Sequence, residues 1–327
     1  MRYFLGADLG STKTHIAIAD EAGLIVGFGC SGPGNHQGVG YDGMLHALQD
    51  GLQQALAQGQ IPIEAIVGAG FGIAGYDWPS DKPAITDVID KLGLNCPIGM
   101  VNDAVPALFA AAEDGWGICL VSGTGCNCRG LDKEHRREGR VTGDGYHMGE
   151  YAGASELVWR AMQLVIYEWT RRGSATALTL ALVNYAGADN LTDLIEGYAK
   201  GRYYVDAQAA PLIFEVAQQG DPVAIDLIRW AGVELGEMAK AVIRQLAFED
   251  LAFDVVLAGS MFEGGPLLID PMWKTITQLA PKARLVRLTA PPVLGAVIFG
   301  MEQAGVAATP EMRQMLIETL QAARMRA

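Results

Sequence analysis

The chain has 327 residues, of which half are hydrophobic and 41 are glycine, a composition typical of a tightly turned α/β protein with room for two domains. Its formal net charge of −13 disfavours nucleic acid and anionic membranes as partners. Five scattered cysteines are typical of reduced thiols rather than of a disulfide framework. With no leader before the first strand and no run of about 18 apolar residues, we expect a cytoplasmic protein.

An apolar strand, a glycine turn and a second apolar strand open the chain. The first strand ends on Asp8 and the second runs from His15 to Asp20, a pattern that predicts a hairpin. The spacing and the following helix of a Walker loop are absent. The turn can still surround phosphate oxygens with its N–H groups, and Asp8 can hold Mg²⁺ directly or through water. An ordinary hairpin whose Asp bonds its own turn explains the same residues. The candidate phosphate-binding residues are Gly10, Ser11, Thr12, Lys13 and Thr14, of which Lys13 is equally compatible with a solvent-facing side chain.

The rest of the first half alternates strands with helices. Two loops rich in glycine, 31–38 and 75–79, follow strands, which is the usual position of sites in α/β proteins. One strand stops at Asn102 and Asp103, directly before an Ala/Leu-rich helix. The expected elements are strands at 24–30, 65–74 and 97–101, and helices at 41–58, 81–92 and 104–113.

A second strand, turn and strand appear ~115 residues after the first, which indicates an internal duplication. Here the strands are 117–121 and 126–131, and the turn is Ser122-Gly123-Thr124-Gly125. Long helices then dominate, and the last helix is long enough to pack back on the first domain. The later expectations are a charged hairpin tip at 133–140, a loop at 143–150, helices at 153–171, 174–185, 190–200, 222–245, 267–280, from 291 and at 310–324, and strands at 254–258 and 284–288.

These pieces, in this order, resemble the sugar kinase, actin and heat-shock ATPase superfamily. The chain resembles more closely its N-acetylglucosamine kinase branch, which also contains the benzoyl-CoA-reductase-activating ATPases. The motifs that carry the resemblance are Gly34-Asn35-His36, Gly72-Ile73-Ala74-Gly75, Asn102-Asp103-Ala104 and the stretch 122–129, the last being the most specific.

The resemblance implies an α/β fold with two RNase-H-like lobes, as in actin-like ATPases, and a nucleotide cleft between them. Residues 1–113 would form an N-terminal lobe with the sugar and phosphate site, joined by the C-terminal helix 306–327. Residues 114–305 would form a larger lobe with the nucleotide site and helical insertions.

The resemblance also implies site roles. Asp103 would be the catalytic base; a helix N-cap aspartate would look identical in sequence, but the two flanking phosphate turns favour the base. Asp8 would organise Mg²⁺, and ATP would lie along Thr124, Gly125, Gly259 and Ser260. The expected sugar-binding residues are Asn35, Ala74, Asn102, Asp103, Asn127, Gly145 and Glu150, of which Asn127 is also compatible with a satisfied polar residue of a strand.

The stretch 148–154 departs from the branch, where the loop usually reads Leu-Gly-Asp-Glu-Gly-Ser. Glu150 stands at the position of the family's sugar-binding Asp, and Tyr151 at that of its Glu, so we expect a reshaped sugar pocket. Cys126 and Cys128 share one strand face and are expected to be structural, because a metal or iron–sulfur site needs more ligands. His147 lacks the second His of a zinc-protease motif.

We therefore expect an ATP- and Mg²⁺-dependent kinase that phosphorylates an amino sugar, N-acetylglucosamine or glucosamine, on its 6-hydroxyl. The alternative is an ATP-hydrolysing activator that drives a conformational change in a partner protein. The expected partners are a small sugar and a second copy of the chain, bound through the helical second lobe, with neither nucleic acid nor membrane.

Overall fold

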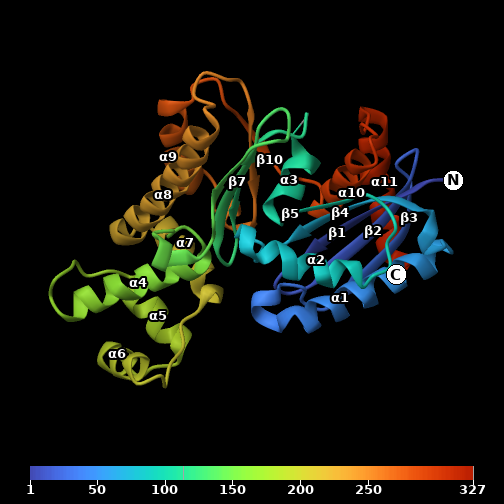
Figure 1. The fold of residues 1–327 in the computed structure, drawn as a ribbon. Coiled ribbons are helices and arrows are strands. Elements are labelled where there is room, and N and C mark those ends of the chain that lie inside the picture. Colours follow the sequence, from blue (N-terminus) through green and yellow to red (C-terminus); the bar gives the residue numbers. More distant parts are fainter. Residues whose placement is uncertain (113, 327) are drawn as a thin grey trace.

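The computed structural model describes residues 1–112 and 114–326 and contains two five-stranded mixed sheets with helices around them (Figure 1). Glu113 and Ala327, the ends of the predicted helices 104–113 and 306–327, lie outside the described residues. In the first sheet the order is β3-β2-β1-β4-β5, formed by β1 (Tyr3–Leu9), β2 (Thr14–Asp20), β3 (Ile25–Ser31), β4 (Ile66–Ile73) and β5 (Ile98–Asn102). In the second sheet the order is β10-β9-β6-β7-β8, formed by β6 (Gly117–Ser122), β7 (Cys126–Leu131), β8 (Glu138–Val141), β9 (Asp254–Ala258) and β10 (Arg284–Arg287).

The two sheets repeat one topology. In each, the first three strands form an antiparallel meander, the fourth pairs in parallel with the first, and the fifth pairs in parallel with the fourth. The predicted duplication and the α/β fold class are confirmed. Because β1 and β6 occupy the same position in their sheets, the turns that follow them are equivalent by topology.

Alternating side chains of β1 supply two different cores. Leu5 and Ala7 face the apolar stripes of α1 (His36–Gly59) and α2 (Lys82–Asp90). Phe4 faces the opposite way, into a core completed by helices from the C-terminal end of the chain. This period of two is what a strand covered on both faces requires.

Two helices lie between the sheets (Figure 1). The first, α3 (Ala104–Ala111), follows β5 but packs on β6, β7 and β9. The second, α10 (Pro292–Gln303), packs on β1 and β4 and crosses α3. The crossing is tight, because a Cβ on Gly295 would lie 1.7 Å from the Pro106 carbonyl oxygen.

The last helix, α11 (Pro310–Arg326), returns to the first sheet, as predicted. The Ile25 N–H donates to Thr319 Oγ1 over 3.0 Å, and Gln58 Nε2 donates to the Ala323 carbonyl oxygen over 2.9 Å. Both ends of the chain therefore contribute to one half of the molecule.

The second sheet carries most of the remaining helices. α8 (Pro222–Leu246) packs on β7 and β8 and against α9 (Pro266–Leu279). Four shorter helices extend to one side, the lower left of Figure 1: α4 (Ala154–Trp169), α5 (Leu178–Ala186), α6 (Leu191–Ala199) and α7 (Ala210–Gln218). In the described part of the chain, no helix combines the length and the apolar character that crossing a membrane requires.

Three expectations about elements are corrected. Helix α7 was not predicted. Strand β8 occupies the end of the predicted hairpin tip 133–140, where charged residues obscured the two-residue alternation of a strand. Helix α1 begins inside the predicted loop 31–38, because the Asn35 side chain caps it by accepting from the Gln37 N–H. Gly40, with φ 70°, then interrupts the helix.

Candidate active site

A hollow of about 220 Å³, here called the polar hollow, lies between the two sheets. It is lined from the first half by Ser11, Asn35, Gln37, Ala74, Gly75, Asp77, Asn102 and Asp103, and from the second by Val121, Gly123, Thr124, Gly125, Cys126, Asn127, Thr142 and Gly143. Eight residues predicted for the site therefore meet in one place: Ser11, Asn35, Ala74, Asn102, Asp103, Thr124, Gly125 and Asn127.

A second hollow, of about 460 Å³, adjoins the first and is here called the α7 hollow. Gly123 and Thr124 line both hollows, so the turn after β6 separates them. The walls of the α7 hollow are α7 and the short helix Ser260–Gly264. The ring of Phe214 lies where a side chain on Gly264 would stand, since a Cβ there would come within 2.2 Å of the ring.

The turn after β1 presents short polar side chains to the outside. It closes through a 3.0 Å bond from the Gly10 N–H to the Lys13 carbonyl oxygen, and Ser11, Thr12 and Lys13 are exposed. Ser11 Oγ accepts from Asn35 Nδ2 over 3.1 Å. Thr14 differs, because its side chain is fully buried beneath Gly34. A direct phosphate contact by the Thr14 hydroxyl would need this segment to move.

The turn after β6 is fixed from behind by the start of α4. The Ala154 N–H donates to the Gly123 carbonyl oxygen over 2.8 Å, and the Ser155 N–H donates to that of Thr124 over 2.9 Å. Gly259, with φ 109°, lets β9 end against this turn, because a Cβ there would lie 2.1 Å from the Ser122 carbonyl oxygen. Ser260 follows it and lines the α7 hollow.

Asp103 occupies the cap position of α3, yet its side chain makes no cap hydrogen bond. The preceding residue, Asn102, caps the helix, since its Oδ1 accepts from the Ala104 N–H over 3.0 Å. The Asp103 side chain lines the polar hollow at the start of α3.

Asp8 and Asp103 both have raised pKa values. Burial raises the pKa of Asp8 from 3.8 to about 7, with a further contribution from the charge on Asp103 and an opposing one from Lys13. Burial raises the pKa of Asp103 from 3.8 to about 6; Asp77 adds to this, and Arg129 and nearby N–H groups oppose it. A cation bound nearby would relieve the repulsion between Asp8 and Asp103.

The residues around Asp8 fit a magnesium ion held mainly through water. No group of three or more His, Cys, Asp or Glu side chains suited to a metal occurs within 1–112 and 114–326. Mg²⁺ is commonly bound by one or two carboxylates, with waters and substrate phosphates completing its octahedron. A single half-buried Asp8 beside the turn after β1 is such a donor.

We expect Asp8→Asn to raise the thermal unfolding midpoint in EDTA, by an amount that grows from pH 5 to pH 8. A carboxyl whose folded-state pKa lies above its unfolded value costs stability as the pH rises from the lower value, 3.8, through the higher, about 7. The asparagine removes that cost. Scanning fluorimetry across this pH range checks the result, with Asp87→Asn on the exposed face of α2 as the control. A gain that is the same at every pH would contradict it.

Asn127 brings an unsatisfied acceptor to the polar hollow. Its Oδ1 is buried and has no hydrogen-bond partner among the described residues. A buried, unpaired amide oxygen costs stability unless a ligand or water donates to it. Asn35 is already engaged, since it caps α1 and donates to Ser11.

Glu150 and Gly145 do not line the polar hollow. The buried Glu150 carboxylate accepts from the N–H groups of Gly143 and Gly145, over 2.8 and 3.0 Å, and from the Thr142 hydroxyl over 3.2 Å. It therefore braces a loop whose residues Thr142 and Gly143 do line the hollow. Tyr151 turns to α8, where its ring centroid lies 5.7 Å from that of Trp230.

Sequence reasoning missed four polar or charged side chains that line or support the hollow: Gln37, Asp77, Arg129 and Thr142. Arg129 offered a signal, because a charged residue in an otherwise apolar strand needs a buried partner. Asp77 lay in a loop already noted for its glycines, but no local pattern pairs it with a residue 52 positions away.

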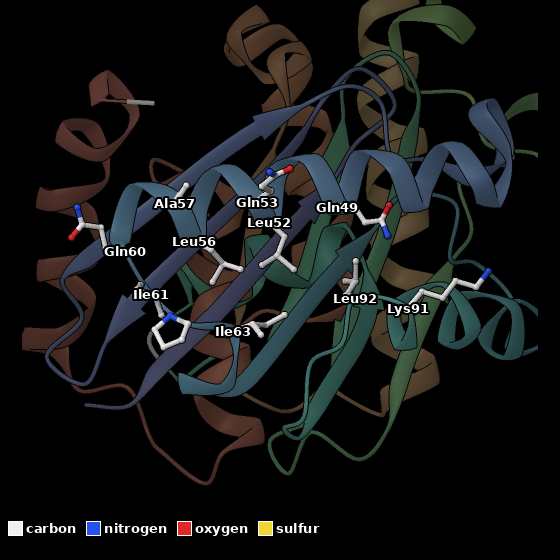
Figure 2. Close-up of a pocket in the computed structure, with 11 residues that line it drawn as sticks. Gln49, Leu52, Gln53, Leu56, Ala57, Gln60, Ile61, Ile63, Lys91 and Leu92 are labelled. Atoms are coloured by element: carbon white, nitrogen blue, oxygen red, sulfur yellow. The ribbon is translucent and has the colours of Figure 1, made fainter.

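Two buried cysteines and the hollow beside α1 lack matching chemistry. Cys126 and Cys128 are buried, and burial raises the pKa of the Cys126 thiol to about 12, which keeps it protonated. A hollow of about 660 Å³ lies between α1 and the segment 60–63, where Leu52, Leu56 and Ile63 point toward one another (Figure 2). Its lining is apolar apart from glutamines and Lys91, and it contains no carboxylate.

Comparison with known proteins agrees with this geometry. The chain is 28% identical to an N-acetylmuramic acid/N-acetylglucosamine kinase of Clostridium acetobutylicum, over 93% of this chain and 99% of that protein. It is 27% identical to an N-acetyl-D-glucosamine kinase of Dictyostelium discoideum, over 91% and 97%. A candidate N-acetylglucosamine kinase from Chromobacterium violaceum has the same fold, with a TM-score of 0.65 at 24% identity, over 91% of this chain and 98% of that one.

The predicted α/β fold with two similar sheets is confirmed by this solved structure. A family match covers residues 5–300, from β1 through most of α10. The chain therefore belongs to the BadF/BadG/BcrA/BcrD ATPase family.

Proposed function

We propose that the chain is an ATP-dependent kinase of an amino sugar, N-acetylglucosamine or glucosamine, acting on the 6-hydroxyl. One observation carries the proposal: the polar hollow, which contains Asp103, adjoins the α7 hollow at Thr124. A nucleotide base in the α7 hollow would send its phosphates past Thr124 toward Asp103. The names of the relatives support the sugar class.

The transfer needs a base, a fixed phosphoryl group and little else from the protein. Asp103 accepts the proton of the sugar hydroxyl as the oxygen forms its bond to the γ-phosphorus. The bond from that phosphorus to the β–γ bridging oxygen breaks, and ADP leaves. With a pKa of about 6, Asp103 is ionised at neutral pH and ready to accept this proton.

Magnesium would be held by Asp8 and water, and when bound it supplies positive charge to the phosphates. On this proposal Gly10, Ser11, Thr12 and Lys13 face the phosphates from one side, with Thr124 and Gly125 opposite. The buried Thr14 supports the turn from below.

For the sugar, we assign direct contacts to residues that line the polar hollow: Asn35, Ala74, Asn102, Asp103 and Asn127. The unpaired Asn127 Oδ1 suits a hydroxyl donor. Glu150 and Gly145 act through the loop that they hold.

Phe214→Ala should raise the KM for ATP about tenfold and leave the KM for the sugar within about twofold. The ring walls the α7 hollow, and loss of an aromatic surface beside a base costs about 1–3 kcal/mol of binding. Initial rates at varied ATP check this, and Tyr204→Ala, at a 79% exposed position, is the control. An unchanged KM for ATP would mean that the nucleotide base binds outside the α7 hollow.

The decisive experiment is a coupled ADP-release assay over amino and neutral hexoses, with and without each sugar. Release that depends on N-acetylglucosamine or glucosamine supports the kinase, and NMR of the product identifies the phosphorylated hydroxyl. Release without any sugar would instead support the alternative, an ATP-hydrolysing activator. An iron–sulfur activator needs thiolates at a subunit surface. Cys126 and Cys128 are buried, so they do not fit that role.

We also propose a cytoplasmic homodimer that associates through the helical part of the second half. An exposed apolar residue there is Leu180, at 66% exposure. Light scattering after gel filtration tests the assembly, and a monomer at micromolar concentration would contradict it.

A further inference from the structure

A buried ion pair joins the two sheets at the edge of the polar hollow. Arg129 of β7 donates from Nη2 to Oδ1 of Asp77, which follows β4 in the other half of the molecule. Their side chains are only 1% and 8% exposed. Asp77 lines the hollow, whereas Arg129 lies behind it and also contacts Glu138 over 3.2 Å.

The two carboxylate oxygens of Asp77 contact side chains from three elements, β7, β5 and α1. Besides Arg129, Oδ1 accepts from Asn102 Nδ2 at the end of β5, over 3.1 Å. Oδ2 lies 3.5 Å from Gln37 Nε2 in α1. Asn102 then caps α3 through the Ala104 N–H. A continuous chain of hydrogen bonds therefore leads from Arg129 of the second sheet to the first turn of the helix that begins beside Asp103.

Stability alone is a poor explanation for this pair. Taking two charges out of water offsets much of their attraction, and apolar residues often serve as well. Arg129 Nε is buried and has no partner in the described part of the chain, which adds a further cost. An ion pair that leaves one buried N–H without a hydrogen bond, beside a candidate site, is better explained by a role in positioning neighbouring residues.

We propose that the Asp77–Arg129 pair is a positioning pair that fixes Asn102 as the cap of α3 and thereby aims Asp103 into the polar hollow. This inference rests on the proposed role of Asp103 as the base. Asp77 is close enough to act on Asp103, because its charge contributes to the raised pKa of that residue. The pair spans both sheets, so the aim of Asp103 depends on contact between the halves.

The first test is a double-mutant cycle on sugar-dependent ADP release. Asp77→Asn should lower kcat about 10–100-fold while the KM values change less than about threefold, because misplacing a catalytic group by about 1 Å has a cost of this size. In an Asp103→Asn background the same change should cost less than about twofold, since the group that it positions is already lost. Equal losses in both backgrounds would overturn the proposal.

The second test needs no activity and so separates this inference from the proposed function. Hydrogen–deuterium exchange at the start of α3 should speed up about tenfold in Asp77→Asn, because the cap from Asn102 loosens. Unchanged exchange there would overturn the proposal even in an active enzyme. If the unaltered chain phosphorylates no sugar, the proposed function fails, and the exchange experiment alone decides whether the pair holds the cap.

Two further variants keep the experiments interpretable. Asp77→Asn with Arg129→Gln removes both charges and leaves groups that can still hydrogen bond; it replaces the single variant if that one does not fold. Asp132→Asn is the matched control: Asp132 pairs with Arg137 over 3.0 Å at the far end of the same hairpin and is only 8% exposed. It should leave both kcat and exchange in α3 unchanged.

Discussion

Replacing Asp103 by asparagine is expected to lower kcat for sugar phosphorylation about 10³-fold, because a positioned general base contributes about 10²–10⁴-fold. Asparagine has nearly the same shape and keeps the hydrogen bonds that an oxygen can accept, but it takes up no proton. Sugar affinity, measured by calorimetry with a non-hydrolysable ATP analogue, should stay within about threefold. In the unaltered enzyme, kcat/KM should fall below about pH 6 as Asp103 becomes protonated.

Asp20→Asn is a suitable control for that experiment. Asp20 caps the tight turn between β2 and β3, where Oδ1 accepts from the N–H groups of Ala22 and Leu24. It tests the loss of a carboxylate away from the polar hollow. If Asp103→Asn retains more than about a tenth of the rate, another group takes the proton and the base assignment is wrong.

Gly295→Ala is expected to have the largest effect on stability. The added Cβ would lie 1.7 Å from the Pro106 carbonyl oxygen and 2.9 Å from the Ala110 nitrogen, so α3 and α10 must separate. Overpacking against backbone costs about 1–3 kcal/mol or more, which exceeds the ~1 kcal/mol that alanine gains over glycine in a helix. We expect a lower urea midpoint with an unchanged m-value.

Gly38→Ala makes the same substitution in another helix, α1, where nothing lies within 4 Å of the added atom. This variant should be neutral or slightly stabilising. If the two substitutions gave equal midpoints, the close crossing of α3 and α10 would not be what Gly295 provides.

Features local in sequence were largely predictable. The two strand–turn–strand units were recognisable because β-branched runs flank Gly/Ser/Thr turns, and their repetition pointed to two similar sheets. Asp103 stood out because it follows a strand directly. The resemblance then brought together residues of both halves, and eight of the predicted site residues do line one hollow.

Features that depend on contacts between distant segments were not predictable. Asn102, which accepts from the Ala104 N–H at the start of α3, also donates to Asp77, 25 positions away. The direction of Thr14 depends on how closely Gly34 approaches it. Glu150 reads as a ligand in sequence, but in the structure three loop donors occupy its carboxylate. In each case the side chain contacts a neighbour that the sequence alone does not identify.

The order in which the chain is made bears on how it matures. The first sheet is synthesised before α10 and α11, which together with α3 cover the face that contains Phe4. Until then that apolar face and the β3 edge are open to other chains, a condition that favours aggregation. A fragment ending before α10 should therefore need a chaperone or precipitate.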